Sequence, residues 1–216
     1  LANDGTYLYV ADYGCHAIRR INLGTSVVST IAGLLGNSGS TDDTGSAARF
    51  TNPVGMVING GILYLTEANH TVRSVNTSTF VVTTIAGSAG NSGVTNDTGA
   101  AARFNAPAGI ATDGTNLYVS DTGNHTIRQV VIATRVTTLL AGSATNDDYV
   151  DGPSATARFD SPAGIIYDGG SLFVADSGND AIREVVAATG ATTTYTGGFG
   201  PGYTDGFEGS DQIKFD

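Results

Sequence analysis

The sequence has little positive charge and no long hydrophobic run. Its 216 residues include ten Lys or Arg against twenty Asp or Glu, which gives a net charge of −10. Such a surface repels phosphate backbones and no basic cluster offsets it, so we expect no nucleic-acid partner. No apolar run approaches the roughly 18 to 20 residues that span a bilayer, so we expect no membrane insertion either.

Cysteine and charged residues are also scarce. Cys15 is the single cysteine, so no disulfide can form within the chain. Charged residues make up 14% of the chain, whereas apolar residues make up 40% and there are 30 glycines. This balance is typical of an all-β protein with many turns rather than of a disordered chain. The acidic, lysine-poor and Ser/Thr-rich composition favours an extracellular or cell-surface location.

What the sequence does contain is a repeat, with four copies of one pattern about 55 residues apart. The clearest copy reads "ARFNAPAGIATDGTNLYVSDTGNHTIRQVVIATRVTTLLAGSA". We interpret residues 1–216 as a single domain or segment. Its repeats run approximately over 1–48, 49–102, 103–157 and 158–213, and 214–216 begin a further one.

Each copy has the pattern of four short strands separated by Gly, Asn and Asp turns. In the third copy we expect them at 108–113, 117–119, 127–132 and 135–141. The second alternates Leu and Val on one face with Tyr on the other, and the fourth is rich in β-branched residues. Four strands repeated head to tail predict the four-stranded blades of a β-propeller.

The run "LYVSDTGNHTIRQV", preceded by "PAGIATDG" and followed by "TTLLAG", resembles the NHL-repeat family of β-propellers. The tripeptide Asn-His-Leu that gives the family its name reads Asn69-His70-Thr71 and Asn124-His125-Thr126 here. The resemblance covers essentially the whole chain. Either a longer chain closes the ring, as in the six-bladed members of the family, or a neighbouring chain completes the open blade. The resemblance implies no single function, because the family includes scaffolds, binding modules and some enzymes.

One histidine position recurs from blade to blade, as His16, His70 and His125, and Asp180 fills it in the fourth copy. A catalytic group acts from one place, whereas a residue repeated in every blade is more simply a structural device. We therefore expect these side chains to satisfy backbone groups in the tight turn between the second and third strands. We assign no catalytic residue.

A carboxylate closes each second strand and an arginine lies in each third strand. The carboxylates are Asp12, Glu67, Asp121 and Asp176, and the arginines are Arg19, Arg73, Arg128 and Arg183. We predict a bidentate ion pair in each blade, with an anion site as the alternative.

A cation followed by phenylalanine precedes each first strand. The pairs are Arg49-Phe50, Arg103-Phe104, Arg158-Phe159 and Lys214-Phe215. We expect the phenylalanine to be buried between blades and the cation to pair across to the next blade.

The long loop before each of these pairs is acidic and contains glycine. Asp43, Asp97, Asp151 and Asp205 recur there. Asx turns are the simpler interpretation. Oxygen-rich loops could instead hold calcium, although none has the fixed 12-residue spacing of a known calcium loop.

Residues outside the repeat pattern are where individual blades would differ in function. Tyr149 lies beside two aspartates, and the Gly-rich run "YTGGFGPGYTDGFEG" contains Phe199, Tyr203 and Phe207. These aromatic residues could bind a partner, although packing at the end of the propeller is the favoured interpretation.

The sameness of the blades favours a non-enzymatic extracellular interaction or structural module, because catalysis needs different groups converging on one point. The partner would be a protein, a glycan or further copies of the chain. In one alternative, the open first and last repeats exchange strands, and the chain assembles into a filament or surface layer. In the other, the resemblance allows a metal-dependent lyase or hydrolase with its site at the propeller channel. We expect no cofactor other than calcium.

Overall fold

The computed structural model describes residues 1–198 and 215. Across these residues, sixteen strands form four separate antiparallel sheets of four strands each. Each sheet follows the order of its strands in the sequence, and each corresponds to one repeat. The prediction of an all-β fold built from four-stranded blades is confirmed.

The strands of the four blades have the following bounds. The first blade contains β1 (Ala2–Asn3), β2 (Tyr7–Asp12), β3 (Ala17–Asn22) and β4 (Val28–Ala32). The second contains β5 (Pro53–Asn59), β6 (Ile62–Glu67), β7 (Thr71–Asn76) and β8 (Val82–Gly87). The third contains β9 (Ile110–Thr112), β10 (Asn116–Asp121), β11 (Thr126–Val131) and β12 (Thr137–Gly142). The fourth contains β13 (Pro162–Asp168), β14 (Ser171–Asp176), β15 (Ala181–Val186) and β16 (Thr192–Gly197).

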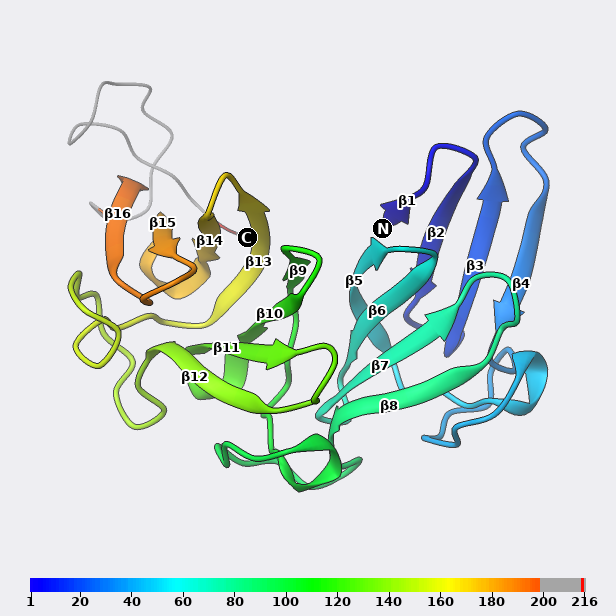
Figure 1. The fold of residues 1–216 in the computed structure, drawn as a ribbon, viewed down its shortest axis with the longest axis horizontal. Coiled ribbons are helices and arrows are strands. Elements are labelled where there is room, and N and C mark those ends of the chain that lie inside the picture. The colour runs from blue at the N-terminus through cyan, green and yellow to red at the C-terminus, as the bar shows by residue number, and fades with distance from the viewer. Residues whose placement is uncertain (199–214, 216) are drawn as a thin grey trace.

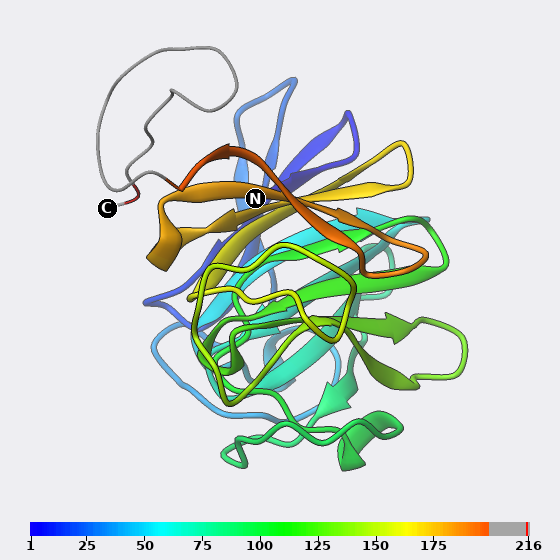
Figure 2. The same ribbon diagram turned by 90° about the vertical axis from the view of Figure 1, so that its left-hand side faces the viewer.

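The blades fan out in an arc, with β1, β5, β9 and β13 toward the centre and β4, β8, β12 and β16 at the periphery (Figure 1). Seen from the side, the sheets are twisted and lie next to one another (Figure 2). Each blade therefore packs its broad face against the next blade, which is the arrangement of a propeller.

The core lies between the blades. Tyr9 and Ile18 of the first blade pack with Leu63 and Leu65 of the second. The corresponding clusters at the next two junctions are centred on Phe104 and Phe159, which are fully buried, as is Phe50 at the first. Successive residues of a strand point to opposite faces of the sheet. Consecutive apolar residues therefore supply the buried side chains on both faces of each blade.

Glycine is required where the fourth strand of a blade ends. Gly142 has a φ of 99°, and a Cβ there would lie 2.6 Å from the His125 carbonyl oxygen and 3.2 Å from the Phe159 ring. An L side chain would meet both obstacles, so the Ala-Gly pair that ends β12 is fixed by close packing.

Four short 3-10 turns are the helical elements of the described residues: η1 (Gly45–Ala47), η2 (Gly99–Ala101), η3 (Thr122–Asn124) and η4 (Ser177–Asn179). None of them has the length or the hydropathy of a transmembrane helix.

Candidate functional site

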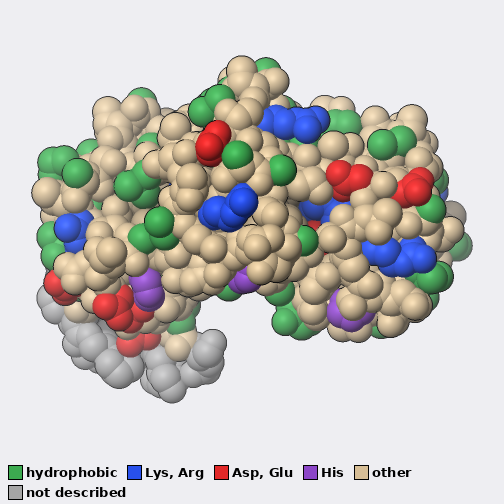
Figure 3. Space-filling view, turned by 90° about the horizontal axis from the view of Figure 1, so that it is seen from below, with side chains coloured by type: hydrophobic (Ala, Val, Ile, Leu, Met, Phe, Trp, Pro, Cys, Tyr) green, Lys and Arg blue, Asp and Glu red, His purple; other side chains and the backbone are tan. Residues whose placement is uncertain are grey.

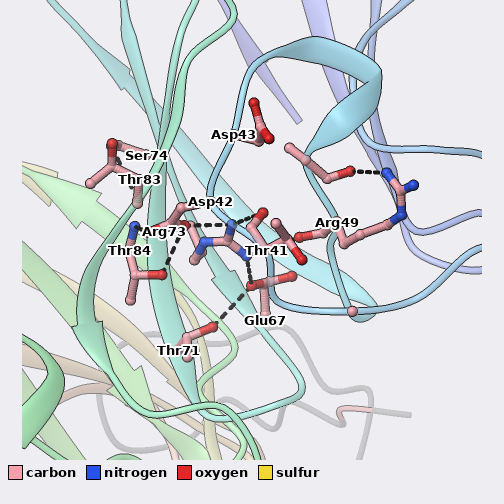
Figure 4. Close-up of polar contacts among 12 residues, drawn as sticks. Thr41, Asp42, Asp43, Arg49, Glu67, Thr71, Arg73, Ser74, Thr83 and Thr84 are labelled. Atoms are coloured by element: carbon pink, nitrogen blue, oxygen red, sulfur yellow. Dashed lines mark hydrogen bonds and ion pairs between the residues drawn. The ribbon is translucent and has the colours of Figure 1, made fainter.

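A buried arginine lies at the centre of the second blade and ties it to the preceding loop (Figure 4). Nη1 of Arg73 donates to Oε2 of Glu67 at 2.9 Å and to the carbonyl oxygen of Arg49 at 3.1 Å. Nη2 donates to Oδ1 of Asp42 at 2.7 Å and to the carbonyl oxygen of Thr41 at 3.1 Å. The guanidinium thus joins a strand carboxylate to a loop carboxylate, and the expected bidentate pair with one carboxylate does not form.

The same arrangement, which we call the arginine pin, recurs in the third and fourth blades. Arg128 donates to Asp121 at 3.0 Å and to Oδ1 of Asn96 at 2.7 Å. Arg183 donates to Asp176 at 2.7 Å and to Asp151 at 2.6 Å. Each guanidinium also lies over the ring of the buried phenylalanine, at 5.1–5.2 Å from its centroid. These contacts hold the long loop against the blade that follows it.

The first blade has a weaker form of this contact. Nη1 of Arg19 lies 3.6 Å from Oδ2 of Asp12, and the two side chains are 35% and 25% exposed. In the pins of the second and fourth blades, both side chains of the strand pair are fully buried.

A β-bulge aims each arginine toward the loop. In all four blades, the register between the third and fourth strands shifts between the arginine and the residue before it, as between Ile127 and Arg128. A bulge bends the strand locally and turns a side chain out of the regular alternation. This explains how a charged residue in a buried strand reaches polar atoms outside its own sheet.

Burial changes the proton affinity of the strand carboxylates. It raises the pKa of Asp121 to about 6, against the hydrogen bonds from the Asn105 backbone, the Asn124 side chain and Arg128, which lower it. Burial also raises the pKa of Glu67 and of Asp176, against the same kinds of opposing contact. The pins therefore hold carboxylates whose ionised form is poorly solvated.

Arg49, Arg103 and Arg158 do not pair with the next blade as we expected, and Lys214, the fourth cation of this set, lies outside the described residues. Nη1 of Arg49 donates to the carbonyl oxygens of residues 46–48, and Arg103 and Arg158 make the equivalent contacts. These arginines therefore close the turn that precedes them.

Phe215 also departs from the expected alignment. Its backbone N–H donates to Asp180, and at the other junctions this contact is made by the residue two positions after the buried phenylalanine.

The repeated histidines reach further than the turn in which we placed them. Nδ1 of His16, His70 and His125 accepts the backbone N–H of Asn52, Ala106 and Ser161, at 3.2, 3.0 and 3.1 Å. Each donor lies 36 residues further along the chain, just before the next blade begins. The histidines and Asp180 have φ between 50° and 76°, in the left-handed region where His and Asp are enriched among non-glycine residues. The position thus combines an unusual backbone conformation with an acceptor that links two blades.

We expect His70→Ala to lower the free energy of unfolding by about 1–2 kcal/mol, because alanine lacks the acceptor and is strained at φ of 76°. His70→Asp, which copies Asp180 at the same position, should lose less than about half of that. Urea denaturation of both variants measures the difference. Equal losses would contradict a role for the acceptor.

The junction between the third and fourth blades differs from the other two. Here Asp160 follows the buried phenylalanine, and its Oδ1 lies 3.3 Å from Nδ1 of His125. Thr51 and Asn105 hold this position at the other junctions. The exposed carboxylate of Asp147 completes a group whose ligand-type atoms lie within 4.8 Å of one another. We call His125, Asp147 and Asp160 the junction cluster. Histidine side chains lie along one face of the molecule, with acidic side chains nearby (Figure 3).

A polar groove also lies between the third and fourth blades. Its volume is about 320 Å³, and it is lined by Asp113, Asn116, Tyr118, Gln129, Tyr167 and Gly170 together with Ala187 and Ala188. The carboxylate of Asp113 accepts two backbone N–H groups, the Asn116 amide and the Tyr118 hydroxyl. Burial acts to raise the pKa of Asp113, but these hydrogen bonds outweigh it and lower the pKa. The groove therefore carries a stable negative charge.

Known proteins share both the repeat and the fold. The human NHL repeat-containing protein 2 is 30% identical over 157 residues, which are 68% of this chain and 22% of that protein. The chain belongs to the NHL-repeat β-propeller family. No family model matches the chain. Among solved structures, a protein of unknown function from Bacteroides thetaiotaomicron has a TM-score of 0.71 at 24% identity, covering 89% of this chain and 46% of that one.

A second solved structure, an auxiliary nutrient binding protein from the same species, has a TM-score of 0.65 at 20% identity, and the match covers 88% of this chain and 46% of that one. The NHL-repeat chain spans 22–30% of the length of the NHL repeat-containing relatives it matches and about half of these solved chains. These likenesses establish the family and the fold, whereas function depends on particular sites.

Tyr149 is held within the NHL-repeat fold. Its hydroxyl lies 2.7 Å from Oγ1 of Thr194, and its ring covers the Arg183 guanidinium at 4.8 Å from the centroid. Phe199, Tyr203 and Phe207, the other three aromatic candidates, lie outside the described residues, as does Asp205.

The loop aspartates that we considered for calcium occupy three different loops. Asp43 and Asp97 each accept the backbone N–H of the following threonine at 2.7 Å. Asp151 has a different place, in the pin of the fourth blade, where it is equivalent to Asp42 and Asn96 and not to Asp43 and Asp97. The sequence analysis missed this one-residue shift. Asn96 and Arg128 are 32 positions apart, as are Asp151 and Arg183, and this shared spacing could have revealed it.

Proposed function

We propose that this NHL-repeat chain is a non-enzymatic interaction module that works outside the cell. The observation that carries the proposal is that the repeated charged residues of the described blades contact one another and the backbone. The polar atoms of the arginines, the strand carboxylates and the histidines form hydrogen bonds within and between blades. Side chains engaged in this way build a scaffold that holds the blades together.

The innermost strands support the same proposal. Within β5, β9 and β13 the one carboxylate is Asp168, at the end of β13. Asp113, which directly follows β9, is engaged in its own turn by four hydrogen bonds. General acid–base chemistry needs several differing groups around one point, and the described channel strands offer few.

The polar groove between the third and fourth blades is the surface that we propose for partner contact. Its negative charge and the amide of Gln129 suit a protein or glycan that presents hydrogen-bond donors. Gln129 belongs to a position that differs in every blade, being Arg20, Ser74 and Glu184 in the others. A variable position on a constant scaffold is where specificity can reside without disturbing the fold.

Affinity capture with a matched pair of variants tests the proposal. The tagged chain is incubated with secreted and cell-surface fractions of its source organism, and retained proteins and glycans are quantified by mass spectrometry. We expect Gln129→Arg to reduce capture at least tenfold, and Ser74→Arg, at the same position of the second blade, to leave it unchanged. Equal capture by both variants would contradict the groove. Retention of no extracellular molecule would contradict the interaction module itself.

A further inference from the structure

The junction cluster contains two hydrogen-bond acceptors that face each other. Nδ1 of His125 accepts the Ser161 backbone N–H at 3.1 Å, so this nitrogen acts as an acceptor and its lone pair points toward Ser161. Oδ1 of Asp160 lies 3.3 Å from the same nitrogen and accepts the Ser161 hydroxyl at 2.9 Å. Ser161 donates to both acceptor atoms, and a cation bound between them would relieve the remaining repulsion.

The separation matches the spacing of two ligands on one metal ion. With bonds of roughly 2.0–2.1 Å to nitrogen and oxygen, two ligands of a tetrahedral zinc ion lie roughly 3.3–3.4 Å apart. Asp147 supplies a third ligand-type atom within 4.8 Å of the others, and its exposed side chain is free to adjust. One imidazole and two carboxylates leave a fourth position for water.

The surrounding structure holds Asp160 in place. Its backbone N–H donates to Asp176 of the fourth blade at 2.7 Å. A Cβ on Gly178 would collide with the Asp160 carboxylate, so a glycine at this position provides the space for the Asp160 side chain. His125 is fixed in turn by its position at the end of η3, with φ of 55°. Two of the three ligands are therefore oriented before any ion arrives.

The cluster is specific to this junction. The residue that corresponds to Asp160 is Thr51 at the junction of His16 and Asn105 at the junction of His70. Neither residue is a carboxylate. In the described residues, this is the one group of His, Cys, Asp or Glu side chains that converges in this way. A purely structural role for the histidine would not call for the added carboxylates.

We propose that the junction cluster binds one divalent transition-metal ion of the zinc type. An imidazole nitrogen with two carboxylates favours such ions over calcium, which prefers six to eight oxygen ligands. The ion fastens residues 147 and 160, near the two ends of the loop between the third and fourth blades, to the turn that contains His125. It also competes with the Ser161 N–H for the Nδ1 lone pair, so binding is reversible and moderate in affinity.

Calorimetric titration of the full chain with zinc chloride tests the proposal. All proteins carry Cys15→Ser, which removes the single thiol, and are treated with a chelator and then dialysed before the titration. We expect one ion per chain and at least tenfold weaker binding in Asp160→Asn. This variant copies Asn105 at the equivalent position, so its fold is preserved. Asp97→Asn, which removes a loop carboxylate elsewhere, should bind zinc like the parent.

A thermal measurement gives an independent readout. Zinc should raise the Tm of the parent and of Asp97→Asn, because a ligand of the folded state stabilises it, and should leave Asp160→Asn unchanged. Absence of saturable binding at millimolar zinc would overturn the proposal. Equal affinity of the parent and Asp160→Asn would also overturn it, because the ion would then lie elsewhere.

Discussion

Replacement of Arg128 by methionine is expected to lower the free energy of unfolding by about 3–5 kcal/mol, the range for breaking a buried ion pair from one side. The change leaves the buried carboxylate of Asp121 without its counter-charge. It also removes the donors to the Arg103 and Thr95 carbonyl oxygens and to the Asn96 side chain. In a chain of this size, the loss corresponds to a fall in Tm of roughly 6–20 °C.

Arg19→Met is the matched control because it makes the same change at the same repeat position. Its pair with Asp12 is longer, at 3.6 Å, and partly exposed, so a loss of less than about 1 kcal/mol is expected. Scanning calorimetry of both variants gives the comparison. Similar losses would show that the pins contribute only the side-chain packing that every blade shares. A second variant, Arg128→Met with Asp121→Leu, should recover part of the loss, because it no longer buries an unpaired carboxylate.

The sequence was sufficient to predict the architecture because each signal was present four times. A single run of alternating apolar residues would have been ambiguous, but recurrence at one spacing identified the blades and the strand order. The phenylalanines before each first strand were recognised as blade-interface residues for the same reason. Phe50, Phe104 and Phe159 are fully buried at the three junctions.

Details that depend on backbone partners could not be predicted. The residues that donate to the histidines are Asn52, Ala106 and Ser161. The donor in each case is the peptide N–H, so their side chains need share no chemistry that a sequence pattern could show. Arg49 behaves in the same way, since its partners are carbonyl oxygens of the preceding turn. A repeat reveals that a polar residue has a constant role, but the atoms it contacts come from the folded backbone.

The junction cluster escaped sequence analysis for the opposite reason. Asp160 and Asp147 lie outside the repeat pattern, so the sequence marks them as residues that differ between blades but does not show that they form one group. Their convergence on His125 depends on the path of the loop between the third and fourth blades. The two aspartates are thirteen positions apart in the sequence, and their meeting at one histidine follows only from the packing of that loop across the turn.

The buried carboxylate of Asp121 should contribute more to stability in mild acid than at neutral pH. Burial raises the pKa of Asp121 to about 6, whereas its ordinary value is 3.8. Between these values the folded chain binds a proton that the unfolded chain does not bind, so the contribution of Asp121 to stability grows as the pH falls from about 6 to about 4. The slope is at most about 1.4 kcal/mol per pH unit.

Comparison with Asp121→Asn isolates this contribution, because asparagine does not titrate. We expect the stability of the wild type relative to Asp121→Asn to increase by about 2–3 kcal/mol between pH 7 and pH 4, measured by urea denaturation at each pH. Asp12→Asn removes the same charge from the same repeat position and corrects for the change in net charge. If the difference shrinks toward acid instead, the attraction of Arg128 outweighs burial and the carboxylate is ionised at little cost to the fold. The pH profile therefore decides whether the arginine pins stabilise the blades by charge pairing or mainly fix the position of each loop.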